Sequence, residues 1–258
     1  MKNPIFSISK LQIKKHNRKI LDIRKLDVHR GSCYVIYGDI GAGKSTLLNV
    51  LFKKESISKD LIRYDNKDIS LISKSSYYKD VCYISQRIEA PWFKVSVENY
   101  IKKKVNTYNN LSDPKKRISS VISKMKLKKY LSSDYRNLSD GERRWIELAI
   151  AIASDTKVLL IDGFGQYLGE EKINILSKIL YRKINYDGAT VIISTHVRER
   201  LSRIASVFIR LDEGRIVSVR SKGKSKGNHQ GKPRGNRKPR PQGKPNKTQK
   251  GTPPKKSE

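Results

Sequence analysis

The chain has 258 residues, of which 56 are lysine or arginine and 24 are aspartate or glutamate, so its formal net charge is +32. No run of about 18 apolar residues occurs and the N-terminus shows no apolar secretory signal, which predicts a cytosolic protein without a membrane-spanning helix. The length suffices for one sizeable core, or a core with a smaller lobe. The excess of positive charge favours an anionic partner or surface.

The first expected elements are two strands. Residues 5–13 and 20–28 alternate apolar and polar side chains, as edge strands covered on one face would. Continuous apolar runs, typical of fully buried parallel strands, follow with helix-like segments between them, at 34–37, 158–161 and 190–193. This pattern predicts a three-layer α/β sheet with an antiparallel β portion at the start.

A phosphate-binding loop is predicted directly after the apolar run at 34–37. The segment G-D-I-G-A-G-K-S-T fits the pattern G-x-x-x-x-G-K-[ST]. Its glycines would bring backbone amides close to phosphates, the Lys44 ammonium would reach the β and γ phosphates, and the Ser45 hydroxyl would ligate Mg²⁺. We therefore expect a nucleoside triphosphate to be bound by Gly38, Asp39, Ile40, Gly41, Ala42, Gly43, Lys44, Ser45 and Thr46. The alternative is a glycine-rich turn with an incidental lysine.

The two cysteines of the chain point to a reducing compartment. Cys33 and Cys82 both lie on strand-like segments and do not have metal-ligand spacing. We expect both to be small core residues, and we expect no disulfide framework.

A helical insertion is expected at about residues 88–137. It contains a helix-like segment at 96–105 and a basic amphipathic stretch at 113–130, whose apolar face is marked by Ile118, Val121, Ile122, Met125 and Leu127. Just after the insertion, Ser139 and Glu142 have the spacing of a capping box that opens a helix.

Four further motifs follow the phosphate loop in the order found in ATP-binding cassette (ABC) ATPases. Gln86 ends an expected strand and resembles the family's Q-loop glutamine, and residues 138–142 (L-S-D-G-E) resemble its signature motif, usually L-S-G-G-Q. Asp162 ends a strand that looks like Walker B, and His196 resembles the switch histidine. Each of these residues alone has an ordinary structural interpretation at a cap or strand end. Together they make the chain similar to an ABC ATPase over about residues 5–219.

The resemblance implies a P-loop NTPase that binds ATP and Mg²⁺ with named residues. It assigns catalytic roles to His196, Gln86 and Asp162, and it places Ser45, Gln86 and Asp162 at Mg²⁺. In the family an upstream aromatic residue stacks on adenine, and His16 is the nearest counterpart here.

The resemblance also implies a dimer with a second ABC ATPase subunit. In the family the signature segment of one subunit closes the phosphate site of the other, which assigns Ser139 and Gly141 to the partner's ATP. The exposed amides at a helix N-terminus suit such a contact with phosphate. Whether the dimer is formed by two copies of this chain or with a different cassette is left open.

An integral membrane subunit is a further implied partner. The chain would be the ATPase component of a transporter or of a cell-envelope or division machine, peripheral on the inner face of the cell membrane. The family's insertion docks on the membrane partner, and Trp92 and Phe93 are candidates for that contact, although two aromatics after a proline also suit a core. The alternatives are a non-membrane ABC protein acting on the ribosome or nucleic acid, and a regulatory ATP-binding protein without substantial catalysis.

The departures from the family pattern predict impaired hydrolysis. Gly163 stands where the family has the glutamate that activates or orients the attacking water, and Gly169 stands in place of an aspartate. Asp140 replaces a signature glycine, so its carboxylate must point away from the phosphate. Glu170 and Glu171 fall at the start of the next expected helix and are not expected to replace the missing glutamate.

The predicted ATPase domain covers residues 1–220, and a separate tail covers 221–258. The tail holds 13 of the lysines and arginines and one acidic residue, and it contains no aliphatic or aromatic side chain. Such a segment is expected to be disordered, because nothing offsets the entropy of ordering it. It could bind anionic lipid or nucleic acid; the alternative is a solubilising appendage with no fixed partner.

Overall fold

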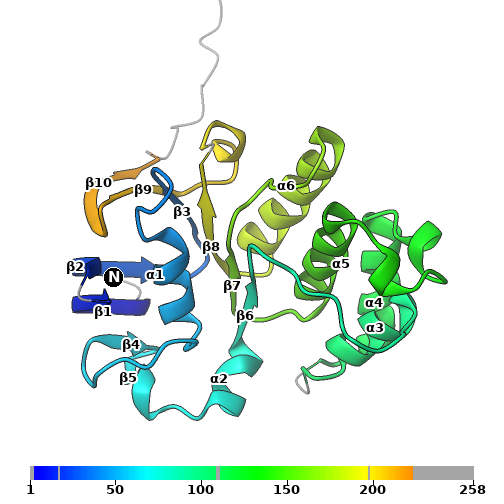
Figure 1. Ribbon diagram of the computed structural model, residues 1–258, viewed down its shortest axis with the longest axis horizontal. Helices are drawn as coiled ribbons and strands as arrows, with labels where there is room; N and C mark the ends of the chain where they lie inside the picture. Colours follow the sequence, from blue (N-terminus) through cyan, green and yellow to red (C-terminus); the bar gives the residue numbers. More distant parts are fainter. Residues whose placement is uncertain (1–2, 17, 109–110, 197, 223–258) are drawn as a thin grey trace, which may run out of the picture. The chain divides into compact units, whose positions relative to one another are not determined.

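The computed structural model describes residues 3–16, 18–108, 111–196 and 198–222. They form two β-sheets with helices packed on them (Figure 1). The smaller sheet has the strand order β2-β1-β4-β5, and its strands are β1 (Pro4–Lys15), β2 (Arg18–His29), β4 (Ile62–Tyr64) and β5 (Lys67–Asp68). All of its pairings are antiparallel, which confirms the predicted antiparallel β portion.

The position of β1 in this sheet differs from the prediction. We expected two edge strands, but β1 lies between β2 and β4, and its residues 6–8 pair with β4. Because β4 has only three residues, it is too short to show an alternating pattern. The strand that pairs with the second edge of β1, namely β4, therefore leaves no periodic signal in the sequence.

The larger sheet has six strands in the order β10-β9-β3-β8-β7-β6. Five run parallel, and β10 pairs antiparallel with β9. The strands are β3 (Cys33–Tyr37), β6 (Val81–Ile84), β7 (Val158–Ile161), β8 (Thr190–Thr195), β9 (Val207–Asp212) and β10 (Arg215–Ser221). Neighbouring residues of β3 enter two separate cores, Val35 on one face and Ile36 on the other. Burial on both faces explains the continuous apolar runs.

The helices complete the three layers. On one face of the larger sheet, α1 (Lys44–Leu51), α2 (Lys74–Asp80) and the smaller sheet share a core. The other face is covered by α3 (Val97–Val105), α4 (Pro114–Lys124), α5 (Asp140–Ala153) and α6 (Glu170–Asn185). The predicted three-layer α/β fold is confirmed.

The predicted helical insertion contains α3 and α4, which pack against α5 (Figure 1). Both helices begin at local signals, because the side chains of Ser96 and Asp113 accept hydrogen bonds from backbone N–H groups of the first turn. The amphipathic stretch at 113–130 is α-helical only as far as Lys124. Lys126 adopts a left-handed backbone with φ 54°, which is incompatible with continuing the helix.

Four short 3₁₀ segments connect these elements, at Ile69–Leu71, Lys128–Tyr130, Tyr135–Asn137 and Glu199–Leu201. Across the four described ranges, no helix has the length and apolar character needed to cross a membrane. Cys33 on β3 and Cys82 on β6 are buried free thiols, as predicted for core residues. Apart from Ser221 and Lys222, the predicted tail at 221–258 lies outside the described residues.

Candidate phosphate-binding site

A cavity of about 530 Å³ is lined by residues that adjoin the carboxyl ends of β3, β6, β7 and β8. The phosphate loop lines it with residues of the segment 40–46, and Gln86, Asp162 and His196 line it from the other strands. The fold thus brings together four predicted motifs, of which the phosphate loop and His196 are at least 150 residues apart in the chain. Gly163, which the sequence placed at the position of the family's catalytic glutamate, also lines the cavity, whereas sequence reasoning missed five further lining residues: Lys15, Ile20, Gln166, Ser194 and Thr195.

Two glycines shape the phosphate loop. Gly43, the N-cap of α1, has φ 95°, and a Cβ atom there would lie 2.8 Å from the Ile20 carbonyl oxygen. A Cβ atom at Gly38 would lie 2.0 Å from the Leu211 carbonyl oxygen. Only glycine fits at either position. Because Gly43 has no side chain to cap α1, the amides of the first turn can bind an anion, and the loop therefore fits a phosphate group.

The Lys44 ammonium lies over the loop itself. It donates hydrogen bonds to the carbonyl oxygens of Gly38 at 2.8 Å and Asp39 at 2.7 Å, and the residue is 7% exposed. Burial lowers the pKa of Lys44, and the carboxylates of Asp162 and Asp39 oppose that shift. A cation held at the cavity wall by two carbonyl groups can turn towards an anionic ligand without leaving the loop.

Asp162 and Ser45 are adjacent across the cavity, as a shared cation site requires. The Ser45 hydroxyl donates to Asp162 Oδ1 at 3.0 Å, and the Ser194 hydroxyl donates to the same oxygen. The Tyr83 hydroxyl lies 3.4 Å from Asp162 Oδ2, and burial raises the pKa of Tyr83. Carboxylate and hydroxyl oxygens are the ligands that Mg²⁺ prefers. Within the described residues, no group of three or more His, Cys, Asp or Glu side chains is placed to hold a metal ion.

Gly163 lies directly after Asp162 and is held in a left-handed backbone. Its φ is +70°, and its N–H donates to Ser194 Oγ at 2.8 Å. A Cβ atom at this position would lie 2.7 Å from Gln166 Oε1 and 3.2 Å from Gln86 Cγ. The side chain of Gln166 therefore occupies the space that a larger residue at position 163 would need.

Arg144 is a buried cation behind the cavity, and sequence reasoning missed it. The residue is 1% exposed, and its guanidinium donates to the carbonyl oxygens of Ser85, Asp162 and Gly163. Burial lowers the pKa of Arg144 to about 10, and the Asp162 carboxylate opposes the shift. The helix α5 is thereby joined to the ends of β6 and β7. An arginine one residue from the apolar face of a helix is ordinarily exposed, so no pattern in the sequence marked it.

The predicted capping box at the start of α5 is present. Ser139 Oγ accepts a hydrogen bond from the Glu142 N–H at 3.3 Å, and Glu142 Oε2 accepts from the Ser139 N–H at 2.9 Å. The bond from the Ser139 amide lowers the pKa of Glu142. These contacts give the signature-like segment a rigid helix start.

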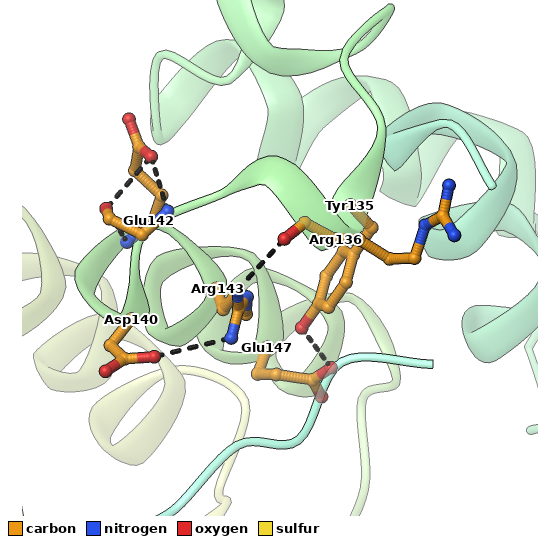
Figure 2. A network of polar contacts seen from close by, with 7 residues as sticks. Tyr135, Arg136, Asp140, Glu142, Arg143 and Glu147 are labelled. Carbon is orange, nitrogen blue, oxygen red and sulfur yellow. Dashed lines mark hydrogen bonds and ion pairs between the residues drawn. The ribbon is translucent and has the colours of Figure 1, made fainter. Parts of the chain in front are cut away.

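Asp140 points away from this capping box (Figure 2). Its carboxylate is 68% exposed and lies 3.4 Å from the Arg143 guanidinium, which also donates to the Arg136 carbonyl oxygen at 3.0 Å. Gly141 packs on the turn after β7, because a Cβ atom there would lie 2.4 Å from the Tyr167 carbonyl oxygen. Neither Ser139 nor Gly141 lines the cavity of its own chain.

Replacing Ser139 by alanine should lower the free energy of unfolding by about 1 kcal/mol, since the first turn of α5 loses its capping oxygen. Urea unfolding followed by circular dichroism measures this change. Ser139→Thr keeps the hydroxyl and should retain most of the stability. Equal stability of Ser139→Ala and the unchanged chain would show that the capping box contributes nothing.

His16 lies outside the residues that line the cavity. It is exposed, with φ 47°, directly after β1, whereas Lys15 and Ile20 on either side of it do line the cavity. Its stacking on adenine, like the catalytic roles of Gln86 and His196, stays a prediction.

Comparison with known proteins identifies the family. A family model described as ABC transporter matches residues 21–163. The cell division ATP-binding protein FtsE of Streptococcus pneumoniae is 28% identical over 222 residues, which cover 82% of this chain and 94% of that protein. A putative ABC transporter ATP-binding protein of Saccharolobus solfataricus is 26% identical over 80% of this chain, which spans only 39% of that relative's length.

Solved structures show the same fold. The ATP-binding subunit of an ABC transporter matches with a TM-score of 0.76 and 19% identity, over 84% of this chain and 90% of that one. The ATP-binding cassette MJ0796, solved as a dimer bound to ADP and Pi, matches with a TM-score of 0.72 and 19% identity, over 84% of this chain and 98% of that one. Since the family model covers more than half of the sequence and the motifs meet in one cavity, the chain belongs to the ABC transporter family of ATP-binding cassettes.

Proposed function

We propose that this chain is the ATP-binding subunit of an ABC-type membrane complex, either a transporter or a cell-envelope or division machine. The observation that carries the proposal is the contact between the Ser45 hydroxyl and Asp162 Oδ1 in a cavity that the phosphate loop also lines. The similarity to FtsE and to transporter ATP-binding proteins supports the same class.

The residues of the cavity divide the work of binding Mg-ATP. The Lys44 ammonium and the amides at the start of α1 would hold the β and γ phosphates, because both present positive charge there. Ser45, Asp162 and Gln86 would hold Mg²⁺, which neutralises phosphate charge when bound. His196, which is exposed at the cavity, would hydrogen-bond the γ phosphate.

A second cassette would complete the site. Ser139 and Gly141 stand at the N-terminus of α5 and do not line the cavity of their own chain, so they would contact ATP held by a partner subunit. The exposed Asp140 side chain adds a negative charge to this surface and would weaken the contact with a γ phosphate. The cassette solved with ADP and Pi is itself dimeric.

Hydrolysis is proposed to be impaired in this chain. Gly163 has no side chain to activate water, and losing a positioned general base typically lowers a rate by about 10²- to 10⁴-fold. Glu170 and Glu171 begin α6, and Glu171 lies 2.7 Å from Lys126, so an ion pair already engages it. A heterodimer would confine efficient turnover to the partner's site, and a homodimer would act as a slow switch.

The helical insertion offers a surface for a membrane subunit. Trp92 is 90% exposed and Phe93 is 37% exposed, and their rings meet edge to face with centroids 5.7 Å apart. Two exposed aromatics do not serve the core, and such residues often anchor protein interfaces. The chain would then sit peripherally on the inner face of the membrane, where the basic residues of 221–258 would favour anionic lipid.

Replacing Lys44 by alanine should weaken Mg-ATP binding by at least about tenfold, because a charge-assisted hydrogen bond to phosphate contributes about 1.5–3 kcal/mol. Fluorescence titration with a labelled ATP in the presence of Mg²⁺ measures the affinity. Lys79→Ala removes one exposed charge from α2 and should leave it unchanged, which separates site binding from nonspecific attraction to a basic protein. Unaltered affinity in Lys44→Ala would overturn the proposed function.

The net charge supports the non-membrane alternative, an ABC protein acting on the ribosome or nucleic acid. Residues 1–220 carry 43 basic and 23 acidic side chains, so the positive charge is not confined to the tail. Cell fractionation at low and high salt separates the two possibilities. Recovery with membranes supports the first proposal, and salt-sensitive recovery with ribosomes supports the alternative. The third possibility, a regulatory ATP-binding protein, is supported by Gly163 and requires ATP binding without substantial catalysis.

A further inference from the structure

Gln166 occupies the place that the side chain of residue 163 would fill. Its Oε1 atom lies 2.7 Å, and its Cδ atom 3.0 Å, from the position of a Cβ atom built on Gly163. The segment from Gly163 to Gln166 turns back on itself through a hydrogen bond from the Gln166 N–H to the Gly163 carbonyl oxygen at 3.3 Å. The turn thus delivers a carboxamide to the position beside Asp162 that Gly163 leaves vacant.

The Gln166 carboxamide has an unused hydrogen-bonding group. Among the described residues, its Oε1 atom is shielded and has no hydrogen-bond partner. A buried polar atom without a partner lowers the free energy of unfolding by about 1–3 kcal/mol, so its presence calls for an explanation such as a functional role. An apolar side chain of similar size would avoid that cost.

Gln166 also stands between two cavities. It lines the 530 Å³ cavity that holds the phosphate loop, and it lines an adjoining cavity of about 120 Å³ together with His196 and Arg200. A cavity of this size has room for water. The amino group of a carboxamide at this wall can donate a hydrogen bond to such a water, whereas the Oε1 atom is shielded.

We propose that Gln166 is a catalytic residue that orients the attacking water in the chain's own phosphate site. This inference rests on the proposed binding of Mg-ATP. Gln166 holds the water so that its oxygen forms a bond to the γ phosphorus while the bond from that phosphorus to the β–γ bridging oxygen breaks, which yields ADP and inorganic phosphate. The proton of the water leaves with the phosphate, because a carboxamide orients water without taking its proton. Gln166 therefore supports slow turnover where Gly163 supplies no base.

The experiment compares Gln166→Leu with the unchanged full-length chain by three measurements. Single-turnover release of γ phosphate should fall at least about tenfold, because the water is no longer oriented. Affinity for Mg-ATP should stay within about twofold, whereas affinity for ADP with aluminium fluoride, a mimic of the transferring phosphoryl group, should fall with the rate. The urea midpoint should not decrease, since the variant removes an unpartnered buried acceptor.

Two further variants sharpen the test. Gln166→Glu places a carboxylate at the same wall and should raise the rate above that of the unchanged chain. Gln12→Leu makes the same chemical change on the exposed side of β1 and should alter none of the measurements. Two results would overturn this inference and leave the proposed function intact, provided that Mg-ATP binding is normal. One is an undiminished rate of phosphate release in Gln166→Leu, and the other is no phosphate release by the unchanged chain. Loss of Mg-ATP binding in Gln166→Leu would assign Gln166 a structural role and would also overturn the inference. The proposed function itself is tested only by Lys44→Ala.

Discussion

Replacing Arg144 by alanine is expected to lower the free energy of unfolding by about 3–5 kcal/mol, the largest stability effect that we predict. Its guanidinium donates to three carbonyl groups at the ends of β6 and β7, and the residue is 1% exposed. Removing it leaves buried acceptors without donors and opens a cavity behind Asp162. Urea unfolding followed by tryptophan fluorescence measures the loss, and Trp145, next to Arg144 in α5, reports on the same core.

Two control variants separate the contributions of Arg144. Arg143→Ala removes the neighbouring guanidinium, which donates to one carbonyl group at 3.0 Å, and should cost only about 1 kcal/mol. Arg144→Lys keeps the charge but cannot reach three carbonyl groups with the geometry of a guanidinium, so its stability should be intermediate. If the free energy of unfolding of Arg144→Ala lies within about 1 kcal/mol of that of the unchanged chain, the three carbonyl contacts do not stabilise the fold.

Combining Gly163→Glu with Gln166→Ala should raise the rate of ATP hydrolysis by about 10²-fold, because the pair of changes supplies a carboxylate base and the space that it needs. Gly163→Glu alone should give much less. Its Cβ atom would lie 2.7 Å from Gln166 Oε1, and the left-handed φ of +70° adds about 1–2 kcal/mol of strain for a residue with a side chain. The single substitution suggested by the sequence thus needs a second one that only the structure reveals.

Steady-state phosphate release under saturating Mg-ATP measures this gain. The matched control combines Gly163→Gln with Gln166→Ala, which restores a side chain of the same size without a base. A double variant with glutamate that is no faster than this control would show that a missing carboxylate does not limit hydrolysis. Both double variants should bind Mg-ATP as tightly as the unchanged chain, since neither changes the phosphate loop.

Signals carried by neighbouring residues allowed much of the fold to be predicted. The G-x-x-x-x-G-K-[ST] segment needs glycine at two backbone positions that no other residue fits, and this requirement appears directly in the sequence. The capping pair of Ser139 and Glu142 spans three residues and is present as predicted. The three-layer fold could be predicted because the strands of a central sheet that is buried on both faces must be apolar throughout.

What only the tertiary structure decided depends on residues that are distant in the chain. The interior position of β1 results from pairing with β4, some 50 residues later. Arg144 and Gln166 belong to the site because α5 and the turn after β7 converge on the end of β6, and a polar residue in a helix or turn does not reveal which distant groups it meets. The sequence alone determined which chemical groups are present and how they follow one another. Three-dimensional packing decided which groups are buried together, because burial and close approach depend on contacts that no local pattern encodes.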